Sequence, residues 1–180
     1  MQGESNSLNP YDLVSAGEDS YKFYTDSGIE YIAYFTNSPD YFSKYPDFNN
    51  DIVSFTFEPH GKVREALYYS GNRASKILGQ SHDKRIMDTV LSLLLGSLVK
   101  SPSKSIIMIC ENDDARDVCR NRLFTRWYNK IFQSNNNLAT KNDNELCGEG
   151  YCSIFISNSN PYHDTIKKAF DNILFEDPSK

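Results

Sequence analysis

The stretch "DKRIMDTVLSLLLGSLVKSPSKSIIMICEN", residues 83–112, joins a long apolar periodic pattern to a short apolar run. Large apolar residues recur at the three- and four-residue spacing that places them on one side of an α-helix. They are Ile86, Val90, Leu93, Leu94 and Leu98, and Leu91 and Leu95 widen the stripe. Ser81 or Asp83 can cap the first turn, and "SPSK" at 101–104 ends the pattern. The spacing therefore predicts a deeply packed helix.

The run "SIIMICEN", residues 105–112, is short, rich in β-branched residues and bounded by turn-forming residues. Such a run is typical of a buried strand. A strand that feeds a helix and returns to a parallel strand of the same sheet does so with a right-handed crossover. We therefore expect this strand to lie parallel to a strand that precedes the long helix.

The residues before the long helix alternate as strands do. Residues 21–25 alternate apolar and polar, "DSG" at 26–28 offers turn chemistry, and residues 31–35 alternate again, so this segment predicts a β-hairpin. A third strand is expected over "IVSFTFEP", residues 52–59. The segment "VREALYY", residues 63–69, is either a fourth strand or a short extension.

The C-terminal part of the chain predicts a second hairpin and a last helix. "LATKNDNELCGEGYCSIFISN", residues 138–158, alternates on both sides of a turn at Gly148–Gly150. "PYHDTIKKAFDNILF", residues 161–175, has the periodicity of an amphipathic helix. Its inward residues are expected to be Ile166, Ala169, Phe170, Ile173 and Leu174.

These elements follow one another in the order βββ-α-β-α-ββ-α. That order predicts an α+β fold with a mixed, mostly antiparallel sheet and helices packed on its faces. The chain of 180 residues is expected to form a single α/β domain over residues 1–180, of which 1–18 are poorly ordered or peripheral.

Targeting signals and cysteine usage point to a soluble cytoplasmic protein. The N-terminus lacks a basic start followed by an apolar stretch, and no apolar run approaches membrane-spanning length. Without an export signal, Cys110, Cys119, Cys147 and Cys152 are expected to be reduced thiols. "CGEGYC" has a spacing that zinc ligands can use, but no second Cys or His pair follows, so we expect no metal.

The net charge of −5 is unevenly distributed along the chain. Residues 1–60 hold 10 acids and 2 bases, residues 61–134 hold 7 acids and 13 bases, and residues 135–180 hold 7 acids and 4 bases. A basic middle can pair with the acidic ends of its own chain, which is the interpretation we favour, or face an anionic partner.

The most basic helix pattern is "ENDDARDVCRNRLFTRWYNKIF", residues 111–132. Asn112, Asp113 and Asp114 are good N-caps, and acids suit the positive end of the helix dipole. At about 100° per residue, five apolar side chains share one arc that predicts the buried face. They are Leu123, Phe124, Trp127, Tyr128 and Ile131. The solvated edge is expected to carry Arg122, Arg126 and Lys130.

Arg116 and Arg120 point into the predicted buried arc, close to the helix N-terminus where the dipole disfavours cations. They therefore need negative charge nearby. One alternative is an internal ion pair with Asp113, Asp117, Asp88 or an acid of the first hairpin. The other is an external anion, held by Arg116 and Arg120 with Asn112 and Asp113 at the helix N-terminus.

The chain resembles a family of small uncharacterised bacterial proteins, a domain of unknown function. The N-terminal part of the likeness is carried by Tyr21, Phe23, Thr25, Gly28, Tyr31 and Phe35, and the middle part by Asp83, Ile86, Thr89 and Val90. Its most specific part is carried by Cys110, Asp113 or Asp114, Arg116, Arg120, Arg122, Leu123, Phe124, Arg126 and Trp127. The likeness covers most of the chain and implies no activity.

A second resemblance is to the GNAT-type acyltransferase fold, whose element order is similar. The spacing N-x-x-A-x-x-V-C-x-x-x-L-F over Asn112–Phe124 is similar to a segment of that family. The family often has its general-acid Tyr where Cys119 stands, a Gly where Leu123 stands, and a Gly-rich pyrophosphate loop before the Asp83 helix. The resemblance implies acyl transfer with coenzyme A.

Three functions remain open from the sequence. The leading hypothesis is a non-enzymatic binding or interaction module with an arginine-rich helix, without cofactor, binding an anionic ligand or a protein. The alternatives are a divergent GNAT-like acyltransferase and a nucleic-acid-binding protein, which would need Arg122, Arg126, Lys130 and Trp127 on one exposed surface. No catalytic residue is identified, because His60, His82 and His163 are far apart and none has a triad pattern.

Overall fold

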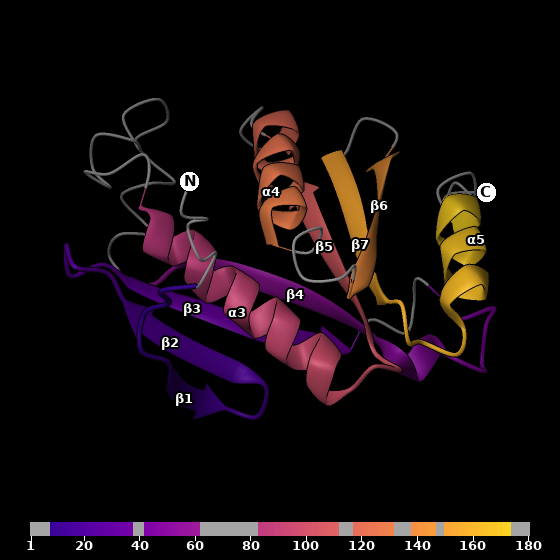
Figure 1. Cartoon of the computed structure of the whole chain (residues 1–180), viewed down its shortest axis with the longest axis horizontal. Coiled ribbons are helices and arrows are strands. Elements are labelled where there is room, and N and C mark those ends of the chain that lie inside the picture. The colour runs from indigo at the N-terminus through magenta and orange to yellow at the C-terminus, as the bar shows by residue number, and fades with distance from the viewer. Residues whose placement is uncertain are drawn as a thin grey trace, which may run out of the picture. The chain divides into compact units, whose positions relative to one another are not determined.

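In the computed structural model the described residues are 8–37, 42–61, 83–111, 117–131, 138–146 and 150–173. Among them the strands are β1 (Val14–Gly17), β2 (Ser20–Tyr24), β3 (Glu30–Asn37), β4 (Ile52–Pro59), β5 (Ser105–Glu111), β6 (Ala139–Leu146) and β7 (Gly150–Ser157). The helices are α3 (Lys84–Lys100), α4 (Asp117–Ile131) and α5 (His163–Ile173), and a 3-10 turn, η2, covers Asn49–Asp51 (Figure 1). The predicted segment 63–69 lies outside the described residues.

The strands form a mixed sheet in the order β1-β2-β3-β4-β5-β7-β6. The pairs β1/β2, β2/β3, β5/β7 and β6/β7 are antiparallel, and β4/β5 is parallel. The α+β class, the predominantly antiparallel sheet and the parallel pair across the long helix are therefore confirmed. The prediction missed β1, because its four residues, VSAG, include only one residue of high strand propensity, Val14.

The chain divides into two compact units. The first comprises residues 1–34 and 57–93, and the second comprises 35–56 and 94–180. The first unit therefore contains β1 and β2 with the first half of α3. The second contains β5, α4, β6, β7 and α5, with the end of α3.

The first unit is built around stacked aromatic rings. Phe23 lies between Tyr11 and Tyr31, with ring centroids 6.0 Å and 5.2 Å apart and nearly parallel planes. Ile86 of α3 and Phe57 of β4 pack against this cluster. Burial raises the pKa of Tyr31 and of Tyr11 above the usual value for tyrosine. The aromatic alternation that predicted the first hairpin is therefore the core of this unit.

Polar contacts fasten the segment before β1 to the first turns of α3. The Tyr11 hydroxyl donates to Asp83 Oδ2 over 2.7 Å, and the Tyr11 backbone N–H donates to Thr89 Oγ1 over 2.8 Å. Arg85 stacks over the Tyr11 ring at 3.9 Å and pairs with Asp26 at 3.1 Å. Asp83 also accepts the Arg85 N–H over 2.9 Å, so it caps the helix as the sequence predicted.

The second unit has its apolar core between the sheet and α5. Ile107, Ile154 and Ile156 of the sheet pack with the inward side of α5 and with the rings before β4. The inward residues of α5 are Ile166, Ala169 and Phe170, as predicted. The predicted inward side chains of Ile173 and Leu174 lie outside the described set. Cys152 is buried in this core.

We expect Leu94→Ala to lower the free energy of unfolding by about 2–5 kcal/mol, because Leu94 is almost fully buried on α3 and its truncation leaves a cavity. Denaturant titration measures the loss. Val99→Ala is the matched control on the same helix, where the side chain is exposed and the change should stay within about 0.5 kcal/mol. Equal losses in both variants would contradict the burial of this stripe.

Candidate functional site

The face of α4 that meets the sheet is more polar than its sequence suggests. Phe124 is buried there, and Tyr128 packs edge-on against Phe155 while its hydroxyl donates to the Ala139 carbonyl over 2.9 Å. Asn121 and Thr125 share this face, since both contact polar side chains of β6 and β7. The sheet-facing side of α4 thus alternates aromatic and hydrogen-bonding residues.

A buried lysine explains the polar residues on that face. The Lys141 side chain on β6 is only 2% exposed, and its ammonium pairs with Asp143 and donates to Thr125 Oγ1 over 3.1 Å. Ser153 on β7 donates to the same Asp143 oxygen over 2.5 Å. An ammonium out of water is costly unless it is paired, so α4 must present acceptors rather than apolar groups here.

The predicted buried arc of α4 is wrong at Leu123. Its side chain is 40% exposed, because the helix turns Asn121 and Thr125 toward the lysine network and so turns Leu123 outward. Trp127 is half-buried and meets Phe124 edge-on at 5.1 Å. Arg122 and Arg126 are exposed, as predicted. We call Arg122, Leu123, Arg126 and Trp127 the outward face of α4.

The predicted anion site falls on residues that the structure does not describe. Asn112, Asp113 and Arg116 lie outside the described residues, and the side chains of Arg120, Lys130 and Ile131 lie outside the described set as well. Of the internal partners considered, Asp88 accepts the backbone N–H of Asn9 over 3.0 Å. The Arg85–Asp26 pair shows a base of the middle segment meeting an acid of the first hairpin.

His163, at the first turn of α5, has hydrogen-bonding neighbours that the sequence did not indicate. Its Nε2 lies 3.0 Å from Thr140 Oγ1 and its Nδ1 lies 3.0 Å from Asp164, which lowers the pKa of the Asp164 carboxyl. Thr140 is 23 residues away, so no local motif revealed the contact. The Thr140 hydroxyl donates to Asn158 Oδ1 over 2.8 Å, so its proton points away from the His163 imidazole. In a catalytic triad the hydroxyl of the nucleophile would instead donate to the imidazole, which acts as the base.

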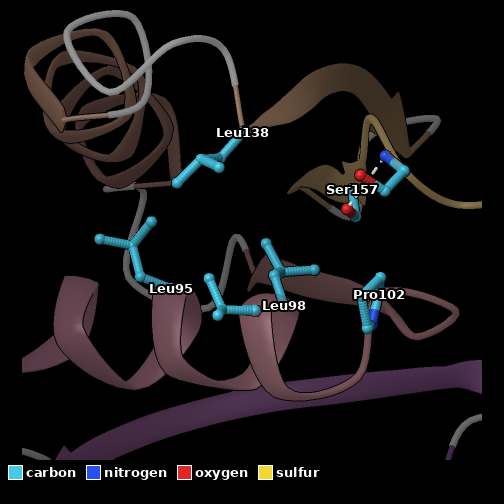
Figure 2. A pocket seen from close by; sticks show the side chains of 7 residues that line it. Leu95, Leu98, Pro102, Leu138 and Ser157 are labelled. Atoms are coloured by element: carbon cyan, nitrogen blue, oxygen red, sulfur yellow. Dashed lines mark hydrogen bonds between the residues drawn. The ribbon is translucent and has the colours of Figure 1, made fainter.

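An apolar groove lies in the second unit, where α3 ends (Figure 2). Its lining residues are Leu95, Leu98, Val99, Pro102, Leu138, Ser157 and Ser159. Figure 2 shows the leucines of α3 on one side and Leu138, which precedes β6, on the other. Its volume is about 190 Å³, which is below the range of about 300–1,000 Å³ typical of small-molecule sites.

Within the described ranges, no three His, Cys, Asp or Glu side chains come together in a group that could hold a metal ion. None of the helices that the structure describes has the length and apolar character needed to cross a bilayer.

The sequence matches the model of a family of unknown function, DUF6169, over residues 82–172. This match covers half of the chain and runs from the start of α3 into α5. The chain therefore belongs to the DUF6169 family. Neither curated proteins nor solved structures gave a match to this sequence.

We expect Asp143→Ala to destabilise the protein by about 3–5 kcal/mol, because it leaves the Lys141 ammonium buried and unpaired. Lys141→Met should cost less, below about 2 kcal/mol, because it removes the buried charge and leaves a carboxylate that is 36% exposed and can be hydrated. Equal costs in denaturant titrations at neutral pH would show that water reaches Lys141 and that the pair does not orient α4.

Proposed function

We propose that this DUF6169 protein is a non-enzymatic binding module and that the outward face of α4 binds an acidic surface of a partner protein. The observation that carries the proposal is the exposure of Arg122 and Arg126, one helical turn apart, with the exposed Leu123 between them. Residues at this spacing project from the same side of a helix, so one partner surface can contact them together.

The outward face combines the residue types that stabilise protein interfaces. Neither Arg122 nor Arg126 makes an ion pair with another residue among those the structure describes, so both guanidinium groups can bind carboxylates in a bidentate manner. Leu123 and Trp127 add apolar area next to the charges. Arginine and tryptophan are also the types most often found at interface hot spots.

A protein partner fits this face better than a nucleic acid. Binding of single strands relies on exposed aromatic rings on which bases stack. Of the three described aromatic residues of α4, Phe124 is buried and Tyr128 is directed toward Ala139 and Phe155, which leaves only the half-buried Trp127 for stacking. The anion site suggested for Arg116 and Arg120 with Asn112 and Asp113 remains a separate proposal, because Asn112, Asp113 and Arg116 lie outside the described residues.

Trp127 is the only tryptophan of the chain, so its fluorescence reports on this face directly. We expect poly-L-glutamate to change the Trp127 emission saturably at low salt. The double variant Arg122→Glu with Arg126→Glu should weaken this binding by about tenfold or more, because two attractions become repulsions. Fluorescence titrations at fixed ionic strength measure the difference.

The matched control is Lys167→Glu with Lys168→Glu, which makes the same change of charge at two exposed positions of α5. Binding by this control should stay within about twofold of the wild type, which is about 0.4 kcal/mol. An equal loss in both double variants would attribute the binding to net charge and refute the proposed face. Tighter binding of a single-stranded oligothymidylate than of polyglutamate would favour the nucleic-acid alternative.

A second candidate function is acyl transfer with coenzyme A, which rests on the resemblance to the GNAT-type fold. The observation that favours it is the short parallel ladder between β4 and β5. The ladder comprises three residue pairs and ends at Ser54 and Ile107, although β4 continues to Pro59 and β5 to Glu111. The segment 73–81, where the resemblance would place the pyrophosphate loop, lies outside the described residues.

If this second candidate is right, acetyl-coenzyme A should raise the melting temperature in a concentration-dependent manner, because a ligand of the native state stabilises it. Equimolar ATP serves as the control for a general effect of phosphate charge. The Arg122→Glu and Arg126→Glu double variant should keep the shift, since the candidate does not involve that face. A shift no larger than that with ATP would exclude coenzyme binding.

A further inference from the structure

We propose that the apolar groove at the end of α3 docks one leucine- or phenylalanine-sized side chain of a partner peptide whose neighbouring residues are acidic. The proposal does not depend on the outward face of α4. It rests on the exposure of the apolar walls, the size of the groove, the hydrogen bonds that fix its frame and the charges beside it.

Two apolar side chains in the walls of the groove are exposed in the described part of the chain. Val99, in the last turn of α3, is 63% exposed, and Leu138 is 42% exposed. Both line the same hollow together with Leu95 and the buried Leu98. Apolar side chains that converge on one concave site can surround an apolar group of a ligand.

The size of the groove selects the kind of ligand. A cavity of about 150 Å³ lined by apolar side chains holds one benzene molecule, so about 190 Å³ suits a single phenyl or isobutyl group. A cofactor would need a larger site. An anchor side chain of a peptide fills such a pocket while the rest of the peptide lies on the surface.

Hydrogen bonds between separate segments hold the frame of the groove in place. The Asn158 N–H donates to the Leu138 carbonyl over 3.0 Å, which ties the entry of β6 to the turn after β7. The buried Asn160 side chain donates to the Ser103 carbonyl over 2.7 Å, which ties the same turn to the connection after α3. The groove is therefore formed before a ligand binds, so its ordering adds little cost to binding.

The charged residues next to the lining residues in the chain favour an acidic partner. Lys100 and Lys104 flank Pro102 in the chain, and neither forms an ion pair with any residue in the described part of the chain. The segments 94–105 and 157–161, which supply most of the lining, contain no acidic residue. A peptide that carries carboxylates next to its apolar anchor complements this pattern, whereas a basic peptide is repelled.

The probe is a fluorescein-labelled peptide with one leucine flanked on each side by aspartates, and its binding is measured by fluorescence anisotropy. We expect saturable binding that weakens with salt, together with shifts of the Leu95, Leu98 and Leu138 methyl resonances. Replacing the peptide leucine by alanine, or the aspartates by lysines, should lower affinity by about tenfold or more.

Protein variants locate the binding to the groove. Val99→Asp and Leu138→Asp should each weaken peptide binding by about tenfold, and Lys100→Glu with Lys104→Glu should also reduce its salt dependence. Leu13→Asp is the matched control, because Leu13 is a similarly exposed apolar residue, at 38%, in the first unit. Thermal unfolding verifies that each variant is folded.

The proposal is overturned if the wild type does not bind the probe, if the alanine peptide binds equally well, or if Leu13→Asp weakens binding as much as Val99→Asp. The double variant Arg122→Glu with Arg126→Glu should leave peptide binding unchanged. If that variant alone abolishes binding while the groove variants bind normally, the peptide contacts α4 only and the groove is not its site.

Discussion

The buried ammonium of Lys141 is the constraint on which the orientation of α4 depends. It lies within the apolar second unit, and Asp143 and Thr125 supply the acceptors that make its burial tolerable. Because Thr125 and Asn121 must face β6 and β7, the opposite side of the helix is left to solvent. Leu123 and the two described arginines of the outward face are exposed for this reason, not because the helix lacks apolar residues.

This constraint also shows where sequence-based prediction succeeded and where it failed. The stripes of α3 and α5 were predicted correctly because both helices pack on apolar surfaces, so hydrophobic periodicity and burial coincide. For α4, hydrophobic periodicity wrongly placed Leu123 on the buried face of the helix. Nothing in the sequence of α4 indicates a covered lysine side chain, that of Lys141, 18 residues further along the chain. A local pattern specifies which residues share a helix side, whereas the partner element decides which side is buried.

The groove and the His163 contact could not be predicted from the sequence, for a related reason. Leu98 and Leu138 line the same hollow although 40 residues separate them. Thr140 of β6 contacts His163 of α5 although 23 residues separate these two. Neither pair has a short motif, because the residues of each pair lie on elements that are distant in the sequence and meet only in the folded chain. Strand β1 was missed for a different reason, since its four residues include only one strand-favouring residue, Val14, on which strand prediction could rely.

The basic residues of the chain differ in their surroundings, since some form internal ion pairs and others are exposed. Arg85, in the basic middle segment, meets Asp26 of the acidic first hairpin, which is the internal neutralisation that the charge pattern favoured. Bases of the second unit differ from one another, because the covered side chain of Lys141 pairs with Asp143 whereas Arg122, Arg126 and Lys100 are exposed. Exposed cations beside exposed apolar side chains cost the free protein little, since each charge keeps its hydration. Both binding proposals rest on this arrangement, because a partner that supplies carboxylates and apolar contact together would complement it.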